Sequence, residues 1–139
     1  MAYFLKLLFS AGRTYFVAMA AAHWHQFKVP LLYIYFDVPS TGYQDKIISF
    51  CAATFAISFF QAVRDPAGAS GLTAILALAT AVVGLSGVNL SSDLRSEIGA
   101  VKSTAPYWVQ TVLIGGLVTV LSLLYRSASS NTKDKKKTK

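Results

Sequence analysis

The stretch GLTAILALATAVVGLSGVNL, residues 71–90, contains no charged side chain. About 20 predominantly apolar residues are what an α-helix needs to cross the ~30 Å hydrocarbon core of a bilayer. Its apolar residues form a continuous block, without the polar face that a helix on the surface of a soluble domain carries. The stretch therefore predicts a transmembrane helix.

Two further stretches have the same character, IISFCAATFAISFFQAV at residues 47–63 and YWVQTVLIGGLVTVLSLLY at residues 107–125. The first follows Asp45, which we interpret as a helix cap, and ends before a proline and a glycine that stop a helix. The chain of 139 residues is 54% hydrophobic and only 14% charged, whereas soluble domains average about 25% charged residues. We predict helices over about 46–63, 71–90 and 107–125 of an integral membrane protein.

The first stretch of the chain, AYFLKLLFSAGRTYFVAMAAAHW, is long enough to span a membrane but carries Lys6 and Arg13. A cleaved signal peptide is one interpretation, because Lys6 supplies a basic region and AMAAA supplies small residues for cleavage. However, Gly12 and Arg13 interrupt the apolar core that such a peptide needs. We favour a fourth span over about 3–25, with Lys6 extended to the interface.

Four spans predict an all-α fold, a four-helix antiparallel transmembrane bundle in residues 1–126. In the third connection, Ser92 and Asp93 resemble a helix cap and three apolar residues follow at helical spacing, which predicts a short interfacial helix. Residues 127–139 contain one alanine as their only apolar residue and predict a disordered basic tail.

The distribution of lysine and arginine predicts that both termini are cytoplasmic. The side with the termini would carry Lys6, Arg64, Arg126 and the tail lysines, while the other side would carry Lys28, Lys46, Arg95 and Lys102. Aromatic rings favour the membrane–water interface. We therefore predict an outer-interface belt made of Trp24, Tyr33, Tyr35, Tyr107 and Trp108.

The C-terminal sequence KKTK resembles the dilysine retrieval signal of eukaryotic endoplasmic reticulum membrane proteins. In a eukaryote this end indicates the endoplasmic reticulum, and otherwise we expect the cell membrane or an organelle inner membrane. A polybasic segment is also attracted to anionic lipid. Membrane lipids, with anionic lipid at the lysine tail, are the first partners that we expect, and nothing indicates nucleic acid.

The histidines of the chain, His23 and His25, lie in the sequence HWHQFK. In a helix they would point roughly 200° apart, whereas an extended backbone would turn both rings to one side. Two ligands are still too few for zinc or copper, and the nearby Asp37 and Asp45 are poor ligands for soft metals. We favour an interfacial position over a metal site at His23 and His25, and we predict no cofactor.

Arg13 would lie within the bilayer, where charged side chains face a partner, a cavity or another subunit. In the predicted topology it approaches Gln61 and Asp65, so we predict an intramembrane polar site of Arg13, Gln61 and Asp65. One interpretation is a site for a substrate or a lipid phosphate. The one that we favour is an ion pair that joins the first two helices.

The leading functional hypothesis is a non-catalytic accessory, structural or assembly subunit of a larger membrane complex. Small residues spaced by four, as at Thr80 and Gly84 or Gly115 and Thr119, permit close contact with helices of other subunits or of a second copy. No catalytic residue is predicted, so the sequence leans away from an enzyme. The alternatives are a small transporter or lipid-handling protein using Arg13, Gln61 and Asp65, and a metal or redox enzyme using the two histidines.

Overall fold

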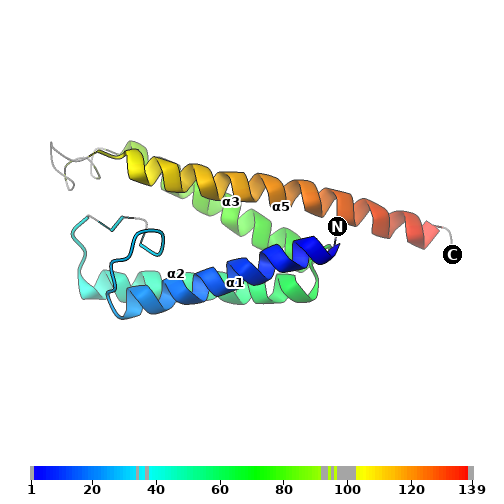
Figure 1. Ribbon diagram of the computed structural model, residues 1–139, viewed down its shortest axis with the longest axis horizontal. Helices are drawn as coiled ribbons and strands as arrows, with labels where there is room; N and C mark the ends of the chain where they lie inside the picture. The colour runs from blue at the N-terminus through cyan, green and yellow to red at the C-terminus, as the bar shows by residue number, and fades with distance from the viewer. Residues whose placement is uncertain are drawn as a thin grey trace.

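The structure is a computed structural model that describes residues 2–33, 35–36, 38–91, 94, 96 and 103–137, with side chains described up to residue 130. It contains four long helices (Figure 1), and the described residues include no strand. The helices are α1 (Ala2–Trp24), α2 (Gly42–Arg64), α3 (Ala69–Leu90) and α5 (Ala105–Lys137). The short interfacial helix predicted after residue 91 lies outside the described residues, apart from Leu94 and Ser96.

Three of the helices are long and apolar enough to cross a membrane: α2, α3 and the part of α5 from Ala105 to Ser130. The prediction of these three apolar helices is confirmed. Helix α1 is 23 residues long, as is α2. It carries Lys6 and Arg13, however, and is not among the three apolar helices. Its passage through a membrane stays a prediction.

Helix α2 begins at Gly42, earlier than predicted, because Thr41 and Gln44 form a capping box. The Gln44 N–H donates to Thr41 Oγ1 at 3.3 Å, and the Thr41 N–H donates to Gln44 Oε1 at 3.0 Å. These bonds satisfy backbone donors that the first turn leaves without partners. The assignment of Asp45 as the cap was therefore wrong, since Asp45 lies inside the first turn and its side chain is buried.

Helix α1 ends in a turn that reverses the chain. The Phe27 N–H donates to Ala22 O at 2.8 Å and the Gln26 N–H donates to His23 O at 3.2 Å. This pair of bonds is the Schellman pattern, and Gln26, with φ of 58°, takes the left-handed position that glycine usually fills. His23 is thus in the last helical turn, while His25 lies beyond it.

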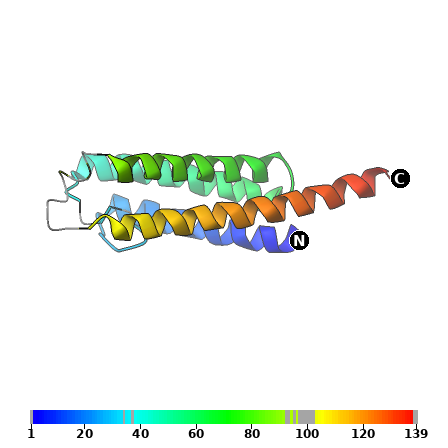
Figure 2. The same ribbon diagram turned by 90° about the horizontal axis from the view of Figure 1, so that it is seen from above.

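Helix α5 continues to Lys137, so residues 127–137 are helical where the composition predicted disorder. No glycine or proline follows Gly116 in the sequence, and lysine is a good helix former, so propagation from the packed part of the helix meets no obstacle. Figure 2 shows this helix extending past the end of the others. The last contact with the turn between α2 and α3 is the Ser129 hydroxyl, which donates to Ala67 O at 3.0 Å.

Helices that follow each other along the chain contact each other. The pairing of α1 with α2 places Ala20 beside Ser49 and Phe9 beside Phe59. Helix α3 starts next to the end of α2 and crosses to the start of α5 (Figure 1), where Asn89 bonds to Thr111. Contacts join α1 to α2, α2 to α3, α3 to α5 and α5 back to α1. We call the end formed by residues 25–41 the loop end of the molecule.

Gly12 of α1 lies close against Phe59 of α2. Phe59 is fully buried, and a Cβ atom added to Gly12 would overlap its ring. The same ring contacts Phe9 and Phe16, at centroid distances of 5.7 and 5.2 Å. Glycine at position 12 therefore allows the aromatic core to lie directly against the backbone of α1.

We predict that Gly12→Ala lowers the stability of the purified protein, because overpacking a filled core costs about 1–3 kcal/mol. Gly116→Ala is the matched control, since a Cβ atom there meets nothing within 4 Å and alanine is the better helix former. Thermal unfolding in mild detergent measures both. Equal melting temperatures of the two variants would contradict the contact.

Candidate functional site

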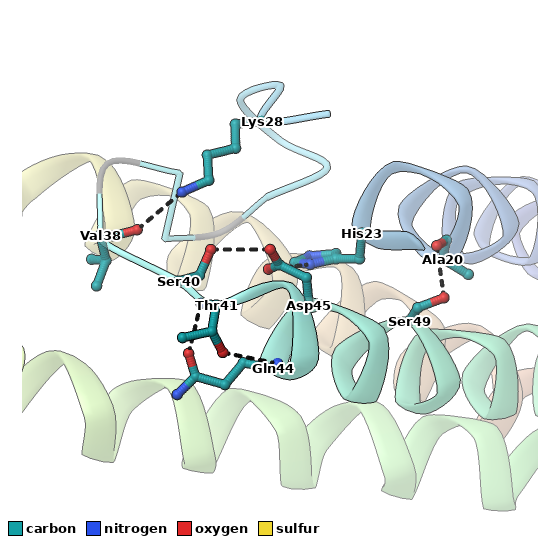
Figure 3. A network of polar contacts seen from close by, with 9 residues as sticks. All are labelled: Ala20, His23, Lys28, Val38, Ser40, Thr41, Gln44, Asp45 and Ser49. Carbon is teal, nitrogen blue, oxygen red and sulfur yellow. Dashed lines mark hydrogen bonds and ion pairs between the residues drawn. The ribbon is translucent and has the colours of Figure 1, made fainter. Parts of the chain in front are cut away.

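A buried pair of polar side chains lies where α1 ends and α2 begins (Figure 3). His23 of α1 faces Asp45 of α2, and Nδ1 of the histidine is 3.6 Å from Oδ1 of the aspartate. The two side chains are only 6% and 2% exposed. The contact between α1 and α2 brings them together, and Ser49, one turn after Asp45, donates its hydroxyl to Ala20 O at 2.8 Å.

Two residues of the first connection complete this group. The ring of Tyr33 stacks on the imidazole of His23, with centroids 3.7 Å apart and planes inclined by 25°. The hydroxyl of Ser40 donates to Asp45 Oδ2 at 3.1 Å. We call His23, Tyr33, Ser40 and Asp45 the His–Asp cluster.

Three buried atoms of the His–Asp cluster have no hydrogen-bond partner among the described residues: His23 Nδ1, Tyr33 Oη and Asp45 Oδ1. A buried polar group left without a partner costs about 1–3 kcal/mol, and more when it is charged. Native structures contain few such groups, and each one calls for an explanation. The cluster therefore has unused hydrogen-bonding capacity in a place where water has little access.

Burial raises the pKa of the Tyr33 phenol, and the nearby Asp45 carboxylate raises it further. Burial, with a smaller contribution from Tyr107, raises the pKa of Tyr35 to about 12. Both phenols therefore remain protonated at neutral pH and keep their donor hydrogens.

Tyr35 anchors the first connection to α3 and α5. Its hydroxyl donates to Asn89 Oδ1 at 3.0 Å, and Asn89 Nδ2 donates to Thr111 Oγ1 at 3.0 Å. Asn89 is 1% exposed, and Thr111 in turn donates to Tyr107 O at 2.9 Å. This chain of bonds holds the loop against two helices and gives each of its buried groups a partner.

A cavity of about 940 Å³ opens beside the His–Asp cluster. Its wall includes His23 and Ser40 from the cluster, together with residues of α2 and of the second half of α3. Gly84 and Gly87 of α3 face open space, because a Cβ atom on either would meet nothing within 4 Å. The divergence of α3 from α2 toward the loop end (Figure 1) leaves this part of the interior unfilled.

A second cavity, of about 490 Å³, lies deeper among all four helices. It shares five wall residues with the first cavity: Met19, Ile48, Gly84, Leu85 and Val88. Apart from Tyr15 and Cys51, its wall consists of aliphatic residues, glycine and phenylalanine. The two cavities therefore adjoin, with polar groups in the wall of the first and an almost entirely apolar wall in the second.

The two histidines of HWHQFK do not converge. His23 is buried against Asp45 and Tyr33, whereas His25 is exposed and its ring lies 5.7 Å from that of Phe27. Within the described part of the chain, no three or more residues of the types His, Cys, Asp and Glu gather closely enough to hold a metal ion. The arrangement pairs one histidine with a carboxylate instead.

The residues of the predicted intramembrane polar site lie at the opposite end of α2. The guanidinium carbon of Arg13 is 5.8 Å from the centroid of the Phe60 ring, and that of Arg64 is 4.3 Å from the same ring. Gln61 and Asp65 are exposed. The ion pairs of the described residues do not include one between Arg13 and Asp65. Both guanidinium groups instead lie near the Phe60 ring in a cation–π arrangement.

The residues of the predicted aromatic belt have different environments. Trp24 is exposed, Tyr35 and Trp108 are half-buried, and Tyr33 and Tyr107 are buried. Their position at a membrane interface stays a prediction. The buried members fill the loop end of the molecule, where Tyr107 packs with Leu94 and Phe36.

Sequence reasoning missed the partnership of His23 with Asp45 and the roles of Tyr33 and Ser40. One signal was available, because Thr41 and Gln44 have the spacing of a capping box. That spacing starts the helix at Gly42 and leaves Asp45 free to face a neighbour. No sequence pattern pointed to the stacking of Tyr33 on His23.

Comparisons with protein-family models, with curated proteins and with solved structures find no match for this chain. The fold and the cluster define a class only: a small helical protein with three helices apolar enough for a membrane.

We predict that stability falls as the pH rises from 10 to 12, because Tyr35 ionises near pH 10 when unfolded and near pH 12 when folded. Between these values the unfolded state binds fewer protons, so the free energy of unfolding decreases with pH, and below pH 10 the contribution is fully present. Tyr35→Phe should make the decrease shallower. Melting temperatures measured across this range test the slope.

Thr111→Val is the matched control, since it breaks the same network without removing an ionisable group. It should lower stability equally at each pH and leave the slope as in the wild type. A slope unchanged by Tyr35→Phe would contradict the buried phenol.

Proposed function

We propose that this chain is an integral membrane protein that binds a lipid-like amphiphile inside an antiparallel bundle of four transmembrane helices. The observation that carries the proposal is the pair of adjoining cavities, which runs from polar groups at the loop end into an apolar interior. An amphiphile has the same polarity pattern. A lipid-handling role therefore has better support than a purely structural one.

Cavities of this size need an occupant. Protein interiors are packed about as densely as organic crystals, and few voids exceed the size of a water molecule. Three apolar helices support a membrane location, and there the molecules at hand to fill an apolar space are lipids. The space is bordered by Ile47 and Ile48 of α2 and by Val88 of α3, which are exposed on the outer surface, so we place the entrance between these helices.

The remaining parts of the proposal concern orientation. Helix α1 would be the fourth span, with Lys6 at the cytoplasmic interface and Arg13 stabilised by the ring of Phe60. Both termini would be cytoplasmic, and the lysines at the end of α5 would lie near anionic lipid of that leaflet. The loop end, with the His–Asp cluster, would face the opposite side.

The lipid-handling function that we propose involves the two cavities and not Arg13, Gln61 and Asp65. Of these three, none is in the wall of either cavity, and the exposed side chains of Gln61 and Asp65 lie at the other end of α2. An intramembrane polar site at Arg13 remains a separate proposal for that end of the molecule.

We predict that Gly84→Leu prevents binding of the amphiphile, because its side chain would project into the space shared by both cavities. The fold should tolerate the change, since the position of a new Cβ atom is open. Native mass spectrometry of protein extracted in mild detergent would show a bound lipid-like molecule on the wild type and its loss from most of the variant.

Val83→Leu is the matched control, because Val83 precedes Gly84 on α3 and its side chain is 72% exposed, away from both cavities. It should retain the bound molecule. If the wild type carries no such molecule after reconstitution with membrane lipid extract, the proposed function is wrong.

A non-catalytic accessory subunit is the second candidate. The observation in its favour is an exposed face of α5 with Gly116 at its centre and large apolar residues on either side: Val109, Val112, Leu113, Val120 and Leu123. Glycine on an apolar helix face lets the backbone of another helix approach closely. This face suits a helix of another subunit or of a second copy.

If this second candidate is right, Gly116→Leu should release the protein from a larger complex. Native gels of membranes extracted in mild detergent would then show the variant as a smaller species than the wild type. Val120→Leu, on the same face, changes one apolar residue for another and should leave the complex intact. A wild-type protein that migrates alone would contradict this role.

A further inference from the structure

The polar groups around the first cavity have used most of their donor hydrogens within the protein. Three hydroxyl groups reach its wall, those of Tyr35, Ser40 and Ser91. They donate to Asn89, Asp45 and Val88, respectively. What these hydroxyls still offer is lone pairs, so this part of the cavity accepts hydrogen bonds more readily than it donates them. The side-chain amide of Gln44, at an exposed position, and the ring N–H of His23 are further donors among the wall residues.

Two of the three unpaired atoms of the His–Asp cluster, Asp45 Oδ1 and His23 Nδ1, add to these acceptors, whereas the third, Tyr33 Oη, keeps a donor hydrogen. Asp45 Oδ1 has a free lone pair, and His23 Nδ1 is also an acceptor when the neutral ring carries its proton on the other nitrogen. The cavity reaches His23 and Ser40, the two side chains that contact the Asp45 carboxylate. A donor placed beside them lies within reach of a buried negative charge.

Among the described residues, the two lysines that flank the start of α2 are engaged elsewhere. Lys28 donates to Val38 O at 3.4 Å, and the ammonium of Lys46 lies 5.5 Å from the centroid of the Trp24 ring. Both side chains are exposed, so neither is buried with the carboxylate.

Asp45 Oδ2 accepts a hydrogen bond from Ser40, whereas Oδ1, which faces His23, has no hydrogen-bond partner among the described residues. A buried carboxylate oxygen of this kind favours a ligand that brings a positive charge and several N–H donors.

We propose that the ligand of the cavity is a long-chain primary amine, with its ammonium group at His23, Ser40 and Asp45 and its chain in the second cavity. This inference rests on the proposed function and adds the chemical class of the ligand. A phosphate next to the amine is disfavoured, because it would place a second negative charge beside Asp45 in a site of low polarity. The occupant is therefore a single-chain amine rather than an amine-containing phospholipid.

The length of the space agrees with a single chain. The wall contributed by α1 extends from His23 to Leu8, a rise of about 22 Å at ~1.5 Å per residue. Half of the ~30 Å hydrocarbon core is about 15 Å, the depth that one lipid chain fills. A chain of that length fits between the His–Asp cluster and the inner end of the second cavity.

Binding of three probes with the same sixteen-carbon chain tests the proposal: hexadecylamine, hexadecanol and hexadecyltrimethylammonium. The amine has both charge and N–H donors, the alcohol has no charge, and the trimethylammonium has charge without N–H donors. Native mass spectrometry of the full chain, titrated with each probe in mild detergent, gives the three dissociation constants. The variants are Asp45→Asn, Gly84→Leu and Val83→Leu.

We expect the wild type to bind the amine about tenfold or more tightly than the other two probes, the factor that one charge-assisted hydrogen bond is worth. Asp45→Asn keeps an acceptor for Ser40 but removes the charge, and should reduce the preference to less than about threefold. Val83→Leu should bind like the wild type. If Asp45→Asn does not fold, the three constants of the wild type decide the question by themselves.

Failure of the amine as the ligand and failure of the proposed function give different results. Equal affinities for the three probes, all lost in Gly84→Leu, would overturn the amine and leave the proposed function standing. A preference for the amine that Asp45→Asn retains would also overturn the assignment to the His–Asp cluster. No binding of any probe to the wild type, or equal binding to Gly84→Leu, would overturn the proposed function itself.

Discussion

The contact of the Phe59 ring with the backbone of α1 at Gly12 is the interaction on which the arrangement of the helices depends. Because position 12 has no side chain, the ring lies against α1 and also meets Phe9 and Phe16. These contacts fix how far α1 is shifted along α2. With that shift set, the last turn of α1 lies opposite the first turn of α2, and His23 meets Asp45. The polar cluster is thus a consequence of aromatic packing more than one turn away.

The cavity follows from the way in which α3 is held at its two ends. At its start, the backbone N–H of Gly71 donates to Asp65 O at 3.2 Å, and a Cβ atom on Gly71 would overlap the carbonyl of Pro66, so α3 begins close to α2. At its other end, Asn89 is bonded to Thr111 of α5. A helix held by α2 at one end and by α5 at the other diverges from α2 along its length. Gly84 and Gly87, which lack side chains, leave the resulting space open.

Much of the helical content was predictable, because uncharged apolar blocks of about 20 residues leave a chain few alternatives in a membrane. For the three apolar helices, most of the predicted ends lie within a few residues of the observed ends. The start of α2 was missed because Asp45 was interpreted as its cap, although Thr41 and Gln44 have the spacing of a capping box. The continuation of α5 to Lys137 was missed. The polar composition of this segment shows that it is soluble in water, but it does not show whether its backbone is helical.

The candidate site was harder to predict, and the reason is geometric. His23 and Asp45 are far apart in sequence, and their meeting depends on the shift of α1 along α2, which no local pattern encodes. Tyr33 and Tyr35 were predicted to lie at an outer membrane interface, which stays a prediction, and the structure turns their rings to His23 and to Asn89. Periodicity finds which residues share a helix face; it does not find which loop residues fold back over the helix ends.

The His–Asp cluster costs stability as it stands. Replacing a buried ion pair by apolar residues of similar volume is often neutral or stabilising. The facing atoms of this pair are 3.6 Å apart, too far for a good hydrogen bond, and Tyr33 Oη beside them is also unpaired. Among the other described residues, α2 is capped, the aromatic rings of α1 and α2 pack together and Asn89 is bonded to Tyr35 and Thr111, while Gln110 Oε1 is one more buried atom without a hydrogen-bond partner. Departures from local rules in an otherwise consistent structure are expected at functional sites. Asp45 Oδ1, which is buried without a hydrogen-bond partner next to the cavity-wall residues His23 and Ser40, is such a departure, and the proposed ammonium group would give it a partner.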